Sequence, residues 1–164
     1  MRISRRTTLF FDASVLVAGS HSEYGGSALL LDACSMAGFT AQTSFLVVLE
    51  ALHSLEENFP QRSLDRFREY LVKVTWDLLP VPSAATLDRY ASLIHPQDIH
   101  VLAAAAQGGS EFLLTLDRRH ILAAVQPVQA AGLAIRIRTP GDFIREYYVL
   151  HNEYALLPPR RESM

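Results

Sequence analysis

Short apolar runs alternate along the chain with longer segments of helical periodicity. The runs are apolar on both faces and rich in β-branched or aromatic residues, as buried parallel strands are, and they cover 7–11, 39–43, 77–81, 111–116 and 133–138. The intervening segments predict helices over 24–37, 44–58, 61–76, 83–94, 96–107, 118–125 and 140–148. Strands that alternate with helices predict an α/β fold: a three-layer α/β/α sandwich around a central, mostly parallel sheet.

The chain has the size of one domain. Its 164 residues are enough to bury about two thirds of the unfolded surface in a single core. Repeats, linkers and low-complexity segments are absent from the sequence. We expect one domain over residues 1–149, followed by a flexible C-terminal tail over 150–164 that ends in "PPRRESM".

The composition limits which binding partners and which cellular compartment we expect for this protein. The net charge is −2, so a nucleic-acid contact has to come from a local patch and not from a broad positive field. Cys34 is the sole cysteine, which excludes an intramolecular disulfide and a thiolate zinc cage and fits a reducing cytoplasm. Arginines before residues 7–19 imitate a signal peptide, but Asp12 interrupts the apolar stretch. We expect a soluble, cytoplasmic protein with no membrane partner.

Four acids stand where a sheet edge would bring them together. Asp12 ends the first strand, in "TLFFDASVLVAG", and Asp117 follows "LLTL"; carboxyl ends of parallel strands meet at one edge. Glu50 lies inside an apolar helix, and Asp98 lies in the first turn of an alanine-rich one. Taken singly, each acid fits a turn, a cap or an exposed helix position. Clustered carboxylates resist ionisation without a cation, and Mg²⁺ or Mn²⁺ prefers such oxygen ligands and suits phosphodiester hydrolysis.

Five motifs follow one another in the order of a known family. They are "FFDASVLVAG", "TSFLVVLEAL", "HPQDIHVLAAA", "EFLLTLDRRHI" and "IRTPGDFI", and the match as a whole spans residues 8–144. Together they resemble the PIN domain, the metal-dependent ribonuclease fold of VapC-type toxins. The resemblance implies Mg²⁺ or Mn²⁺ as cofactor and a catalytic, metal-binding set of Asp12, Glu50, Asp98 and Asp117. It also implies accessory roles for the hydroxyls of Ser14 and Thr115.

The resemblance further implies a function and partners. The expected activity is endonucleolytic cleavage of single-stranded or loop RNA by the toxin of a toxin–antitoxin pair, a homodimer inhibited by a small antitoxin. Arg118 and Arg119 adjoin Asp117 and are candidate RNA contacts, although exposed arginines are common on any surface. Two alternatives stay open: a non-catalytic PIN-like RNA- or protein-binding module, and an RNA-processing nuclease outside a toxin–antitoxin system. A structure-specific DNA nuclease is disfavoured, because it would be expected to carry arch-like insertions and a stronger basic surface, and the sequence shows neither.

Other catalytic arrangements fit the sequence less well. Glu50 and His53 form an E-x-x-H pair, but a di-iron bundle needs a second copy. Phosphatases of the haloacid-dehalogenase type need a second aspartate where this chain has Ser14, and Ser14 lacks the G-x-S-x-G elbow of a hydrolase nucleophile. Neither arrangement predicts the chemistry of the site.

Two further features carry weaker expectations. His95 and His100 flank Asp98, but helical spacing places neither on its face, so we do not expect them to be ligands. Apolar stripes are either core or a groove for a partner helix, and they run through Leu29 and Leu30 and through Leu64, Phe67 and Leu71.

Overall fold

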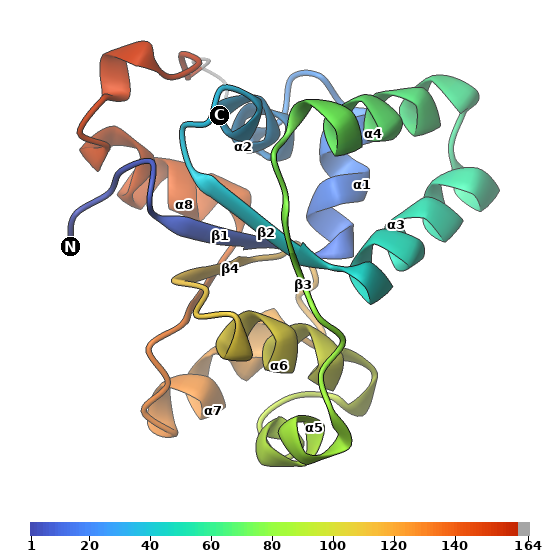
Figure 1. The fold of residues 1–164 in the computed structure, drawn as a ribbon, viewed down its shortest axis with the longest axis vertical. Helices are drawn as coiled ribbons and strands as arrows, with labels where there is room; N and C mark the ends of the chain where they lie inside the picture. The colour runs from blue at the N-terminus through green and yellow to red at the C-terminus, as the bar shows by residue number, and fades with distance from the viewer. Residues whose placement is uncertain (161–164) are drawn as a thin grey trace.

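Five parallel strands form the central sheet of the computed structural model, which describes residues 1–160 (Figure 1). The strand order is β3-β2-β1-β4-β5. The strands are β1 (Thr8–Phe11), β2 (Thr40–Ser44), β3 (Asp77–Leu79), β4 (Phe112–Leu114) and β5 (Arg136–Arg138). The predicted three-layer α/β fold is confirmed, and every pair of neighbouring strands in the sheet is parallel.

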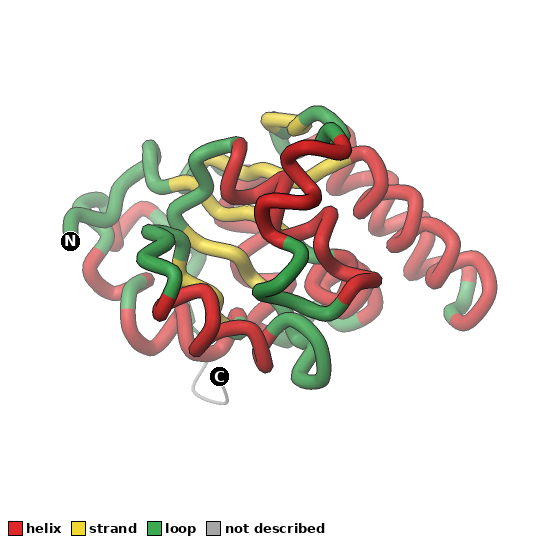
Figure 2. The backbone as a smooth tube through the Cα atoms, turned by 90° about the horizontal axis from the view of Figure 1, so that it is seen from below, coloured by secondary structure: helices red, strands yellow, loops and turns green. Residues whose placement is uncertain are grey.

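Helices cover both faces of the sheet (Figures 1 and 2). One face carries α1 (Ala13–His21), α2 (Gly26–Ser35), α3 (Phe45–Asn58), α4 (Gln61–Lys73) and α8 (Pro140–Glu146). The other carries α5 (Ala84–Tyr90), α6 (Ile99–Gln107) and α7 (Val125–Ala130). Four short 3₁₀ turns complete the description, namely η1 (Pro96–Asp98), η2 (Leu122–Ala124), η3 (Tyr148–Leu150) and η4 (Tyr154–Leu156).

The central strand is apolar because both of its faces are covered. Leu9, Phe10 and Phe11 of β1 are fully buried. Close packing extends to the helices: a Cβ on Gly19 of α1 would come within 2.5 Å of the Leu31 side chain of α2. The apolar stripes at Leu29–Leu30 and around Leu64 and Phe67 are also buried, so they belong to the core and form no partner groove.

Two helices differ from the sequence prediction. Helix α1 was not predicted, because both of its sides are buried and its sequence therefore lacks amphipathic spacing. The predicted helix over 118–125 was wrong: residues 118–121 form a turn, followed by η2 and α7. The turn forms because Asp117 Oδ1 accepts the backbone N–H groups of Arg119 and His120, each at 3.0 Å.

The end of the chain packs against the domain through residue 158. His151 is buried, forms a bridge with Ile3, and shares a 2.7 Å hydrogen bond between its Nε2 and the Gly38 carbonyl. The Tyr148 hydroxyl donates to the Pro158 carbonyl at 2.6 Å. The expected boundary at 149/150 therefore does not separate the packed body from a tail, and the last part of that segment, 161–164, lies outside the described residues.

No helix within residues 1–160 is long and apolar enough to cross a membrane.

Candidate active site

The four predicted acids line one pocket at the carboxyl edge of β1 and β4. The pocket has a volume of about 400 Å³. Its lining comes from the residue after β1 and from α1, from α3 and the segment that follows it, from η1 and from the segment after β4, and consists of Asp12, Ala13, Ser14, Val17, Glu50, Ser54, Phe59, Asp98 and Asp117. Acids that lie up to 105 positions apart in the sequence (12 to 117) thus face the same space.

Asp12 is the buried acid at the base of this arrangement. It follows β1 directly and is the N-cap residue of α1, although its side chain makes no cap hydrogen bond. Its residue is 4% exposed, and its Oδ2 accepts the hydroxyls of Ser14 at 2.7 Å and Thr115 at 2.9 Å. Burial raises the pKa of Asp12, while these hydrogen bonds oppose the rise and the charge of Asp98 adds to it.

Two backbone groups orient the hydroxyls that bind Asp12. The Leu116 N–H donates to Ser14 Oγ at 2.9 Å, and the Asp117 N–H donates to Thr115 Oγ1 at 3.0 Å. Each hydroxyl oxygen is thus occupied as an acceptor, which leaves its hydrogen for the Asp12 carboxylate. Ser14 and Thr115, predicted as accessory residues from the resemblance, both lie in hydrogen-bond contact with Asp12.

Asp117 is half-buried and fixed by the turn that follows it. Its Oδ1 is held by two backbone N–H groups, and its Oδ2 lies 3.8 Å from His120 Nδ1. Arg118 and Arg119 belong to the same turn and are exposed. Their side chains are not part of the pocket lining, so any RNA contact by them would lie outside the acidic pocket.

Asp98 is buried and has a histidine partner that sequence reasoning missed. It ends η1 and precedes α6, and its Oδ2 lies 2.8 Å from His120 Nδ1. An ionised carboxylate only accepts hydrogen bonds, so the imidazole N–H donates and orients it. The two residues are 22 positions apart in the sequence, and no local sequence pattern predicts their contact.

Glu50 lines the pocket from α3. It lies on α3, which begins after the Ser44 side chain accepts the Val47 N–H at 3.3 Å. The residue is exposed, yet partial loss of solvent around its carboxyl raises the pKa of Glu50. The charges of Asp12, Asp98 and Asp117 raise it further, which is the repulsion expected of acids that share one pocket.

His100 lies on α6, near enough to Asp98 and Asp12 for their charges to act on it. Burial lowers its pKa, against the opposing charges of Asp98 and Asp12. Its Nδ1 is buried and has no hydrogen-bond partner within residues 1–160. His100 is therefore half-buried near the site, and it does not line the pocket.

The pocket's chemistry fits a hard divalent cation. Burial and mutual repulsion disfavour the ionised form of Asp12 and Glu50, and a cation would relieve both. Oxygen ligands are those that Mg²⁺ and Mn²⁺ prefer, and Mg²⁺ keeps several of its waters, so the carboxylates need not all touch the ion. Asp12, Glu50, Asp98 and Asp117 are the residues that could hold it.

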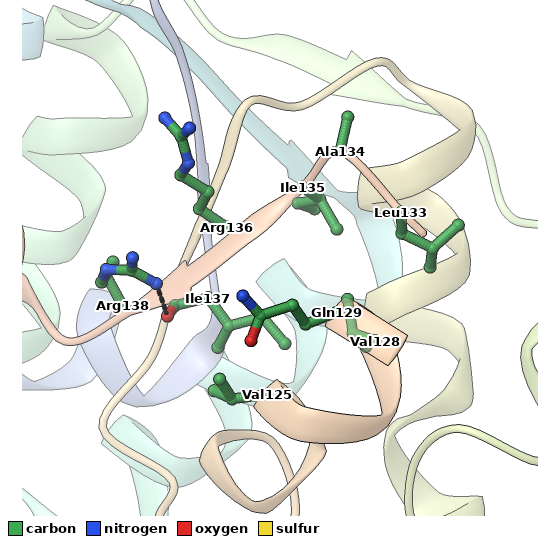
Figure 3. A pocket seen from close by; sticks show the side chains of 9 residues that line it. All are labelled: Val125, Val128, Gln129, Leu133, Ala134, Ile135, Arg136, Ile137 and Arg138. Atoms are coloured by element: carbon green, nitrogen blue, oxygen red, sulfur yellow. Dashed lines mark hydrogen bonds between the residues drawn. The ribbon is translucent and has the colours of Figure 1, made fainter. Parts of the chain in front are cut away.

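A second pocket lies at the far edge of the sheet and has a different character. It has a volume of about 320 Å³ and lies between α7 and β5 (Figure 3). Figure 3 shows Arg136 and Arg138 of β5 among the residues that line it, with Arg138 donating to the Ile137 carbonyl at 2.9 Å. Acids and nucleophilic side chains are missing from its lining, so it offers no chemistry comparable to the acidic pocket.

Comparison with known proteins supports the fold. By sequence, no family model and no curated protein matches the chain. By structure, the chain is similar to a crystal structure of VapBC2 from Rickettsia felis bound to a DNA fragment from their promoter. That match has a TM-score of 0.55 and 11% sequence identity, and it covers 81% of this chain and 98% of the other. The chain therefore has the PIN-like fold of VapC-type proteins, as its motifs predicted.

Proposed function

We propose that this protein is a Mg²⁺- or Mn²⁺-dependent endoribonuclease that hydrolyses phosphodiester bonds in single-stranded or loop RNA. The observation that carries the proposal is the meeting of Asp12, Glu50, Asp98 and Asp117 around one pocket. A divalent ion bound there supplies activation of water and neutralisation of charge on the phosphate. The PIN-like fold is consistent with this chemistry but does not by itself imply it.

The chain's own residues hold the acids in place for that role. Asp12 is fixed by two hydroxyls, Asp98 by an imidazole and Asp117 by two backbone N–H groups. Rigid carboxylates lose little freedom when they bind an ion and a phosphate, which is the advantage of a preorganised site. Glu50 is the exposed member and completes the set from α3.

Arg118 and Arg119 are the proposed contacts to the RNA backbone. Both are exposed in the turn that begins at Asp117, so a phosphate that reaches the acids passes close to this turn. A guanidinium group recognises phosphate through paired hydrogen bonds. With a net charge of −2, the protein would bind RNA through few contacts of this kind.

The biological setting that fits best is the toxin of a toxin–antitoxin pair in the cytoplasm, held inactive by a small antitoxin and assembled as a homodimer. Its support is the similarity to a VapBC2 complex and an exposed apolar surface on α3 beside Glu50. This α3 surface is formed by Phe45, Leu46 and Leu49, which are exposed despite their size. Contiguous exposed apolar residues mark contact sites for other proteins.

Cleavage of an end-labelled single-stranded RNA tests the activity. Wild type, Asp12→Asn and the control Asp88→Asn, which changes an exposed acid on α5, are compared with Mn²⁺, with Mg²⁺ and with EDTA. We expect metal-dependent cleavage by wild type and the control that is lost in Asp12→Asn. Equal cleavage by all three, or cleavage unaffected by EDTA, would contradict the proposal. A folded wild type that binds metal and cuts no RNA would instead favour the non-catalytic binding module.

A further inference from the structure

Two histidines and an acid meet beside the acidic pocket. His95 lies between α5 and η1, Asp98 ends η1, and His120 lies in the turn after β4. One nitrogen of each ring and one carboxylate oxygen all lie within 4.8 Å of one another. Among residues 1–160, no other set of three histidine, cysteine or acidic side chains brings its donor atoms this close together. His95 and Asp98 lie at the two ends of η1, and His120 comes from a turn 22 positions beyond Asp98, so the fold brings His120 to the other two.

His120 and Asp98 already have nearly the spacing of two ligands on one ion. Their Nδ1 and Oδ2 atoms are 2.8 Å apart. Tetrahedral bonds of 2.0–2.1 Å to nitrogen and oxygen place two donor atoms about 3.3 Å apart. A cation can therefore replace the shared hydrogen after a small opening of the pair, with the neutral imidazole then carrying its proton on Nε2.

His95 would have to change its present contacts to join them. Its ring stacks on that of His120 with centroids 3.7 Å apart and planes 5° from parallel. Parallel rings do not aim their in-plane lone pairs at one ion, so binding requires His95 to tilt out of the stack. Its residue is exposed, and its Nδ1 accepts the N–H of exposed Gln97 at 3.2 Å, a bond that water can replace.

The ligand set selects a different class of metal from the acidic pocket. Imidazole nitrogens suit zinc, nickel and cobalt, whereas an all-carboxylate pocket suits magnesium and manganese. We propose that His95, Asp98 and His120 form a binding site for a divalent cation of the Zn²⁺ type. Three protein ligands leave at least one position for water.

Because Asp98 belongs both to this site and to the acidic pocket, a cation bound at one affects binding at the other. Asp98 lines the acidic pocket and also contacts His120. A Zn²⁺ ion on the histidine side draws on the same carboxylate that the acidic pocket offers to Mg²⁺ or Mn²⁺. Zn²⁺ at the histidine site therefore inhibits Mn²⁺-dependent cleavage, an effect that rests on the proposed ribonuclease function, whereas the binding site itself does not.

Zn²⁺ titration by calorimetry tests the site directly. We compare wild type with His95→Gln, His120→Gln and Asp12→Asn, and with the control His53→Gln, which changes an exposed histidine on α3. We expect one Zn²⁺ per chain for wild type and the control, an affinity about tenfold or more weaker for either site histidine variant, and binding retained in Asp12→Asn. Because His95 is exposed, its variant keeps the test valid if His120→Gln folds poorly.

Imidazole NMR supplies the second readout. Zn²⁺ is expected to shift the ring resonances of His95 and His120 together, as the stack opens, and to leave those of His53 unchanged. Zn²⁺ affinity unchanged in both site histidine variants would overturn the inference, as would a loss of binding in Asp12→Asn equal to theirs. Failure of the ribonuclease proposal shows separately, as absence of RNA cleavage in Mn²⁺ by a protein that still binds Zn²⁺.

Discussion

Thr115 joins two acids through one hydroxyl group: it donates to Asp12 Oδ2 at 2.9 Å while its oxygen accepts the backbone N–H of Asp117 at 3.0 Å. The side chain is fully buried just beyond β4, and Asp12 lies just beyond β1. The two strands are neighbours in the sheet, so the hydroxyl bridges adjacent strand ends. It therefore fixes Asp12 and the segment that leads into Asp117 relative to each other.

Thr115→Val is expected to loosen the site while keeping the side-chain volume. The change removes one donor from Asp12 and leaves the Asp117 N–H without its acceptor, at a cost of about 1–3 kcal/mol in the free energy of unfolding. Chemical denaturation and Mn²⁺ titration measure the two effects. Thr115→Ser retains the hydroxyl and should recover most of the Mn²⁺ affinity. Equal Mn²⁺ affinities for Thr115→Val and Thr115→Ser would show that the hydroxyl does not support metal binding.

Asp12→Asn is expected to stabilise the protein in the absence of metal. Asp12 is buried and carries a raised pKa, so its ionised form opposes folding at neutral pH. An asparagine oxygen can still accept the two hydroxyls, and the expected gain is about 0.5–2 kcal/mol. Thermal unfolding in EDTA measures it. A lower melting temperature than wild type would show that the charge of Asp12 is already compensated within the protein.

The free energy of unfolding should also depend on pH, because the pKa of Asp12 differs between the folded and unfolded states. A folded-state pKa above the unfolded value of 3.8 means that the folded protein binds more protons. The stabilising contribution of protonated Asp12 is therefore complete below about pH 3.8 and is lost as the pH rises through the folded-state pKa. Relative to Asp12→Asn, metal-free wild type should lose stability from about pH 4 towards neutrality. A difference between the two proteins that stays constant with pH would contradict the raised pKa.

The α3 surface is expected to mediate assembly. Phe45 and Leu49 are 53% and 43% exposed and lie one helical turn apart. A charge placed there by Leu49→Glu should weaken an apolar contact without loss of folding, because the side chain is outside the core. Light scattering of the purified protein measures the change, with Glu56→Gln on the same helix as a control. A dimer that persists unchanged in Leu49→Glu would place the contact elsewhere.

Much of the fold was predictable because hydrophobic pattern and chain order determine it. All five strands occur where apolar runs predicted them, and Ser44 and Pro140 stand at the starts of α3 and α8. Helix α1 was missed because a helix buried on several sides resembles a continuation of the apolar strand. The turn at 118–121 was missed because the side chain of Asp117 organises it, which periodicity does not reveal.

The candidate site was predictable in part for a similar reason. Strand-end acids follow from topology, and the pocket is lined by each of the four predicted acids. Nothing in the sequence indicated that His120 belongs to the site, because its contact with Asp98 depends on how the turn after β4 lies against η1. His95 was set aside on helical spacing, but it precedes the helix and stacks on His120 from a loop.

The central claim is that the four acids act as one metal-dependent catalytic site, and the Mn²⁺ dependence of single-turnover RNA cleavage tests it most directly. Wild type, Glu50→Gln and the control Glu56→Gln, which changes an exposed acid on the same helix, are compared across Mn²⁺ concentrations. The account predicts a saturable dependence on Mn²⁺ for wild type and the control, with cleavage by Glu50→Gln at least about 100-fold slower at saturation. Equal maximal rates for Glu50→Gln and wild type, or cleavage independent of Mn²⁺, would contradict it.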